Sequence, residues 1–101
     1  MSIEITIGNR TFPSKIAAKR YYRDILNRYP VGAEITGDDA RAVEALLQAR
    51  PDKLAELGGR RVVRFRREED PAHYRRSTCF MAELDDGTFL DIGYMKFIER
   101  L

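Results

Sequence analysis

Arginine is concentrated in one short segment of the chain, residues 60–67, which reads RRVVRFRR. The segment holds five arginines and no acidic residue. Guanidinium groups bind phosphate oxygens in paired hydrogen bonds, and phosphate contacts supply most of the affinity for nucleic acids. On a β-strand, Arg60, Arg64 and Arg66 share one face with a single valine. A face with three guanidinium groups is unsuited to the hydrophobic core, which favours an exposed surface that binds a polyanion. The alternative is that these charges protect an edge strand from aggregation.

A second basic row lies in the segment 15–29, which reads KIAAKRYYRDILNRY. Lys15, Lys19 and Arg23 are four residues apart, which places them on one side of an α-helix. Such a row can contact phosphates, but most rows of this kind are solvated helix faces. We expect both basic segments to form one continuous surface that binds RNA in preference to DNA, with contacts from Lys15, Lys19, Arg23, Arg60, Arg64 and Arg66.

The other reactive side chains do not form a recognisable site. His73 and Cys79 have no orienting residue at a spacing typical of a nucleophile pair, and Cys79 begins an apolar segment, which predicts a small buried residue. Glu83 and Asp91 flank a predicted turn whose register directs them to opposite faces. No glycine-rich phosphate loop or zinc-ligand spacing is present. We therefore predict no catalytic residue, no metal, no cofactor and no small-molecule substrate.

Three tyrosines of the basic helix, Tyr21, Tyr22 and Tyr29, are chemically able to stack on bases. At about 100° per residue they fall on the apolar stripe of the helix, together with Ala18 and Ile25. This position favours a role in the core.

The chain has 101 residues, of which 44% are hydrophobic and 34% charged, and its net charge is +2. This length suits one domain, and the apolar share excludes collagen-like and grossly disordered classes. The single cysteine excludes an intramolecular disulfide and is typical of a reducing compartment, so we expect a cytoplasmic protein. The N-terminus lacks a secretory pattern and no run of about eighteen apolar residues occurs, so we expect no membrane contact.

Hydrophobic periodicity and turn residues predict the secondary structure. Strands are expected at residues 3–7, 10–12, 61–67, 79–84 and 88–92. Helices are expected at residues 15–29, 40–50, 51–57 and 94–101. Ser14 and Asp38 are the predicted N-caps of the first two helices, and Gly58 suits the end of the third. Residues 68–77 are expected to form an exposed connection.

Asp86-Gly87 predicts a two-residue turn that places Leu84 opposite Phe89 and Ala82 opposite Asp91. Helices that precede a run of hairpin strands favour an α+β fold. We expect a mainly antiparallel sheet with two principal helices packed on it, in a single compact domain over residues 1–101.

Three blocks of the sequence, taken in order, are similar to those of a known protein family. They are KIAAKRYYRDILNRY at 15–29, VEALLQARP at 43–51 and CFMAELDDGTFLDIGYMKFI at 79–98. In this order and spacing they resemble the DCL family (defective chloroplasts and leaves), also catalogued as a domain of unknown function. Plant members are associated with ribosomal RNA maturation, so the resemblance implies ribosomal RNA as the partner. It implies no catalytic residues.

The sequence thus predicts a non-enzymatic RNA-binding accessory protein that acts in ribosomal RNA processing. The alternative is a protein-interaction module that docks on a larger complex. Three observations would favour this alternative. One is an exposed apolar patch. The second is the placement of the two basic segments on opposite faces of the fold. The third is a set of arginines held in ion pairs with Glu68, Glu69 and Asp70.

Overall fold

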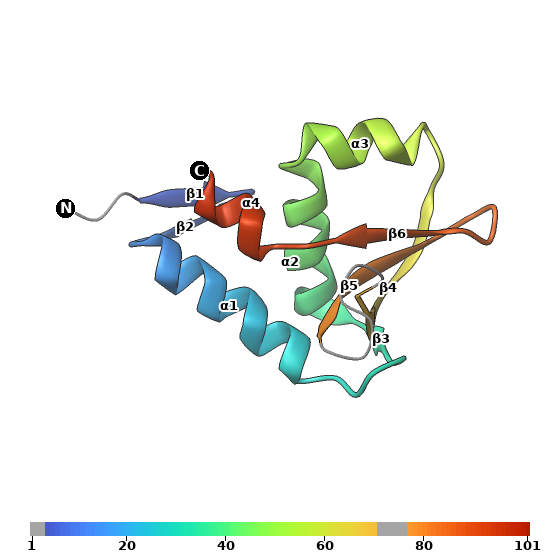
Figure 1. The fold of residues 1–101 in the computed structure, drawn as a ribbon, viewed down its shortest axis with the longest axis horizontal. Helices are drawn as coiled ribbons and strands as arrows, with labels where there is room; N and C mark the ends of the chain where they lie inside the picture. Colours follow the sequence, from blue (N-terminus) through green and yellow to red (C-terminus); the bar gives the residue numbers. More distant parts are fainter. Residues whose placement is uncertain (1–3, 71–76) are drawn as a thin grey trace.

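The computed structural model describes residues 4–70 and 77–101. Figure 1 shows the elements of this part of the chain in order. The strands are β1 (Ile5–Ile7), β2 (Arg10–Phe12), β3 (Glu34–Ile35), β4 (Val62–Glu69), β5 (Thr78–Leu84) and β6 (Phe89–Ile92). The helices are α1 (Lys15–Asn27), α2 (Gly37–Gln48), α3 (Pro51–Leu57) and α4 (Met95–Glu99). None of these helices is long and apolar enough to cross a membrane.

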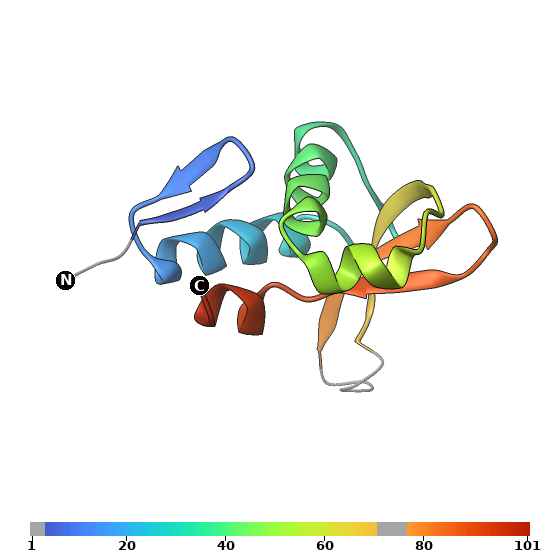
Figure 2. The ribbon, with the colours of Figure 1, turned by 90° about the horizontal axis from the view of Figure 1, so that it is seen from above.

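The strands form two antiparallel sheets, which confirms the predicted α+β class. β1 and β2 make a two-stranded hairpin, and the larger sheet has the order β3-β4-β5-β6. In the view of Figure 2, the hairpin and α4 lie on opposite sides of α1, and both contact this helix. α3 lies beside β6, an edge strand of the larger sheet.

Only one face of the larger sheet meets the core. Phe65 of β4 and Phe80 of β5 are buried there, and the Phe80 ring lies 6.2 Å from the ring of Tyr22 on α1. α2 contributes buried side chains to the same core, among them Leu46. Since successive strand residues alternate between faces, the side chains on either side of Phe65 belong to the opposite face.

The first helix follows its local sequence closely. The Ser14 hydroxyl accepts a hydrogen bond from the Ala17 N–H at 3.1 Å, as expected of an N-cap. The helix ends at Asn27, two residues earlier than predicted, because Pro30 disfavours a helical conformation at Tyr29.

The second helix begins earlier than predicted. It starts at Gly37, so Asp38 is a first-turn residue and the N-cap is Thr36. Asp38 and Asp39 complement the positive end of the helix dipole instead of capping it. The prediction for α3 is confirmed at Pro51–Leu57, and Gly58 ends it in the left-handed conformation. The two residues of β3 were not predicted, because so short a strand leaves no periodic signal.

The β5–β6 hairpin forms, but its predicted register was wrong by one residue. The Leu84 N–H donates to Thr88 O at 2.9 Å, which encloses a three-residue loop closed by Gly87 at φ +84°. The Asp86 carboxylate accepts a hydrogen bond from the Thr88 N–H at 3.0 Å and stabilises this longer loop. Asp91 therefore pairs with Met81 rather than with Ala82.

The corrected register reverses one expectation about side chains. Glu83 and Asp91 lie on the same face of the sheet, not on opposite faces. The connection predicted at 68–77 is also shorter, since β4 runs to Glu69 and β5 begins at Thr78. Its centre and His73 lie outside the described residues.

Gly87→Ala should lower the free energy of unfolding by about 1–2 kcal/mol, because an L-residue is strained in the left-handed region. The matched control is Gly93→Ala, at a glycine that does not have a positive φ and is equally free of neighbouring atoms. Urea denaturation of both variants measures the difference. Equal stabilities would show that the left-handed conformation is not required at Gly87.

Candidate nucleic-acid interface

The arginines of β4 are held by protein groups. Arg66 donates from Nη1 to Glu83 Oε1 at 3.2 Å and from Nη2 to Gly32 O at 2.7 Å. Its Nε faces the Glu68 carboxylate at 3.0 Å without hydrogen-bond geometry. Arg64 lies 3.7 Å from the other oxygen of Glu83. These two guanidiniums therefore belong to a network of charges across the outer sheet face.

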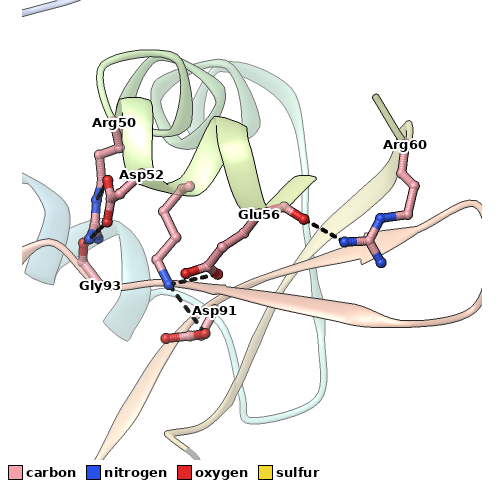
Figure 3. A network of polar contacts seen from close by, with 7 residues as sticks. Arg50, Asp52, Glu56, Arg60, Asp91 and Gly93 are labelled. Carbon is pink, nitrogen blue, oxygen red and sulfur yellow. Dashed lines mark hydrogen bonds and ion pairs between the residues drawn. The ribbon is translucent and has the colours of Figure 1, made fainter. Parts of the chain in front are cut away.

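Arg60 has a structural role between α3 and the β5–β6 hairpin (Figure 3). Its guanidinium donates to the carbonyl oxygens of Glu56 and Leu57, which end the helix. The same group donates to Thr88 Oγ1 at 2.9 Å and pairs with Asp86 at 3.2 Å. A phosphate would have to replace several of these bonds at once.

The two basic segments do not form the continuous surface that the sequence predicted. Arg64 and Arg66 flank the buried Phe65, so they lie on the outer face of the sheet. α1 packs against the inner face through Tyr22 and Phe80. The sheet thus separates the α1 row from the β4 arginines.

The α1 row meets α4 instead. Lys15 Nζ donates to Glu99 O at 2.8 Å, and Lys19 Nζ donates to the Glu99 carboxylate at 2.9 Å. The Lys19 hydrogen bond holds the pKa of the Glu99 carboxyl below its ordinary value, and the charges of Lys96 and Lys15 act in the same direction. The two helices lie side by side (Figures 1 and 2). Glu99 links them through its bonds to Lys15 and Lys19.

Several cations on these two helices have no side-chain partner. Among residues 4–70 and 77–101, the side chains of Arg20, Arg23, Lys96 and Arg100 form no hydrogen bond or ion pair. Lys96 and Arg100 were missed in the sequence, although their spacing of four residues is the same signal that marked the α1 row. We call Lys15, Lys19, Arg23, Lys96 and Arg100 the α1–α4 basic face.

A cleft of about 800 Å³ opens beside α4 and is lined by Lys96 and Arg100. Its opposite wall is a fixed charge network (Figure 3). Arg50 donates to Gly93 O at 2.7 Å and to Asp52 at 2.8 Å, which ties the start of α3 to the segment after β6.

Lys53 completes that wall. Its side chain is almost fully buried, and its Nζ lies 3.4 Å from both Glu56 and Asp91. Since the cations of this wall are paired, those free to bind a ligand are on α4.

The cleft does not carry a reactive nucleophile. Cys79 lines it and is buried, as the sequence predicted. Burial and the nearby carboxylates of Asp70 and Asp91 raise the pKa of the thiol to about 12, so it is protonated at neutral pH. No group of three or more potential ligand side chains that could hold a metal ion occurs in the described part of the chain.

Residues 23–98, from the middle of α1 through most of α4, match the family described as Protein of unknown function (DUF3223). The chain belongs to this family. The match corrects the resemblance to the DCL family, because no comparison indicates a DCL member. The implied link to ribosomal RNA loses its basis with that resemblance.

The fold of this DUF3223 member has a solved relative. The solution NMR structure of an uncharacterized protein from Rhodospirillum rubrum matches with a TM-score of 0.79 and 24% sequence identity. The match covers 95% of this chain and 88% of the other. The similarity shows a shared fold. No curated protein matches the chain.

Lys19→Gln should raise the pKa of Glu99 toward its ordinary value, since the main hydrogen bond to the carboxylate is lost. The lowered pKa means that the pair stabilises the fold at neutral pH, and that this contribution disappears as the pH falls through the folded-state pKa. Carboxyl ¹³C NMR titration measures the change. Lys96→Gln, which removes only a more distant charge, should have a smaller effect, and an unchanged pKa in Lys19→Gln would contradict the pairing.

Cys79 should react slowly with a thiol reagent at pH 8, because the thiol is buried and its pKa is about 12. Unfolding in urea should accelerate the reaction to the rate of a free cysteine. Absorbance assays with an aromatic disulfide measure both rates. A native-state rate equal to that of the unfolded protein would show that Cys79 is accessible.

Proposed function

We propose that this domain is a non-enzymatic RNA-binding accessory protein that contacts RNA phosphates through the α1–α4 basic face. The proposal keeps Arg23 from the sequence-based site, and it keeps Lys15 and Lys19 because their shared partner, Glu99, is exposed. It replaces Arg60, Arg64 and Arg66, which are held by protein groups, with Lys96 and Arg100.

The charge balance of two neighbouring helices carries this proposal. The segments 15–27 and 95–100 contain six lysines and arginines and two carboxylates, Asp24 and Glu99. This surplus of positive charge exceeds the +2 of the whole chain. A local surplus of this kind attracts a polyanion even when the net charge is small.

The position of α1 favours a single strand over duplex DNA. A recognition helix fits into the major groove of B-DNA only if its outer face and both of its sides are free of neighbouring elements. α1 has one face in the core, and the β1–β2 hairpin and α4 lie along its two flanks (Figure 2). Its outer surface is open to a strand that lies across it, which suits unpaired RNA better than a groove.

Two alternatives remain. The separation of the two basic segments and the ion pair of Arg66 with Glu68 favour a docking module. The large exposed apolar side chains that such a module would use belong to different elements and loops of the described chain, among them Ile16, Val31 and Phe89. An enzyme would need an activated group, and the Cys79 thiol is protonated. We place the RNA-binding function in the cytoplasm, since a free cysteine fits a reducing compartment.

The double variant Lys96→Gln/Arg100→Gln should bind single-stranded RNA more weakly than the wild type at all sequences. If both cations contact phosphates, the slope of log affinity against log salt should fall by about 1.4, at about 0.7 per contact on a single strand. The stability should change by less than about 1 kcal/mol, because both side chains are exposed. Fluorescence anisotropy titrations at several salt concentrations measure the slope, with DNA of the same sequence as a second ligand.

Arg64→Gln is the matched control, since it removes an exposed arginine of β4 that lies near Glu83 and does not line the α4 cleft. It should leave the RNA affinity unchanged. An equal loss in both variants would place the contact elsewhere than on the α1–α4 basic face. A wild-type protein without salt-dependent RNA affinity would refute the proposed function and favour protein docking.

A further inference from the structure

A second hollow lies on the flank of α1 away from α4. It has a volume of about 500 Å³ and is enclosed by the β1–β2 hairpin, α1 and α2. Arg10 and Thr11 of the hairpin, Tyr21 of α1 and Arg41 of α2 are among the residues that line it. This volume is within the range of small-ligand sites.

An arginine and a tyrosine are stacked at this hollow. The guanidinium carbon of Arg10 lies 4.6 Å from the centre of the Tyr21 ring, and Arg10 is exposed. The Tyr21 ring is fixed from behind, since its centre lies 5.2 Å from the rings of both Phe12 and Tyr22. Among the described residues, Arg10 forms no ion pair or side-chain hydrogen bond, so its charge is not neutralised by a carboxylate.

This stacked pair suits an unpaired nucleobase. Bases that are not in a helix stack on aromatic rings and on guanidinium planes, and their phosphates bind nearby cations. Arg41 is positioned for such a role: its ion pair with Asp38 is exposed on both sides, and exposed pairs exchange at little cost.

The outer surface of α1 connects this hollow to the α1–α4 basic face. At about 100° per residue, Arg20 lies about 60° around the helix from Arg23, and Tyr21 lies about 100° further in the same direction. Arg20 is exposed and has no ion-pair partner in the described chain. A strand bound at Arg23 would therefore pass a further cation before it reaches Tyr21.

We propose that Arg10 and Tyr21 form a stacking platform for one unpaired base of the bound RNA. The inference rests on the proposed function and deepens it, because it specifies the ligand as RNA with at least one unstacked nucleotide. Tyr21 keeps its packing in the core, and Arg10 supplies the surface that meets the base.

The test uses the full chain and a short single-stranded RNA that contains 2-aminopurine, whose fluorescence falls on stacking. Anisotropy of a terminal dye reports binding, and 2-aminopurine fluorescence reports stacking. The wild type should quench the 2-aminopurine on binding. Arg10→Lys retains the charge and loses the planar group, so it should abolish most of the quench and weaken binding by about five-fold or more.

Two matched variants separate stacking from charge and from folding. Arg41→Lys makes the same exchange at another residue that lines the same hollow and should retain the quench. Tyr21→Phe keeps the ring and should also retain it. The same RNA in a fully paired duplex should show no further quench, because its bases are already stacked.

The two proposals fail in different ways. No salt-dependent anisotropy change with any RNA would refute the proposed function. Salt-dependent binding without a quench, or an Arg10→Lys variant identical to the wild type, would refute the platform and leave the α1–α4 basic face intact. Equal loss of quench in Arg10→Lys and Arg41→Lys would also refute it, since the effect would then belong to the hollow as a whole.

Discussion

Tyr22 is the residue on which the arrangement of the domain depends. Its ring lies 6.2 Å from each of three other aromatic rings, those of Phe12 in the hairpin, Phe80 in the sheet and Tyr94 before α4. Its hydroxyl donates to the Ala42 carbonyl of α2 at 3.4 Å. One buried side chain of α1 therefore contacts every layer, and burial raises the pKa of its hydroxyl, which keeps that group a neutral donor.

The central position of Tyr22 explains why the basic row of α1 lies apart from the arginines of β4. The apolar stripe that contains Tyr22 must face Phe80, so the lysine row must point to the side, where α4 meets it. The β4 arginines lie on the outer side of the sheet, with Glu83 between them. The two basic segments of the sequence thus belong to two different environments. Arg64 and Arg66 pair with Glu83, and the α1 row meets α4 through Glu99.

The parts of the structure that follow local rules were predictable from the sequence. Ser14 caps α1, Pro51 begins α3 and the Asp86-Gly87 pair lies in the hairpin loop, since each depends on its immediate neighbours. The register of that hairpin was not predictable, because a hydrogen bond from Thr88 to the Asp86 side chain selects a three-residue loop. Arg60 pairs with Asp86 and Thr88, and Arg66 pairs with Gly32 and Glu83. These partners are distant in sequence, so composition alone presents both arginines as free cations.

The arginines at the end of β4 also affect self-association. β3 pairs with only two residues of the eight-residue β4, which would leave much of that strand as an open edge. Arg66 and Arg67 bind the carbonyls of Gly32 and Tyr29, and backbone hydrogen bonds join Gly32 and Ala33 to Arg67, so the loop after α1 lies along this edge. The stretch of unpaired backbone on which a second chain could extend the sheet is therefore shorter than the two residues of β3 alone would leave. Guanidiniums that suggest a polyanion site in the sequence thus hold, in the folded domain, the loop that covers part of a sheet edge.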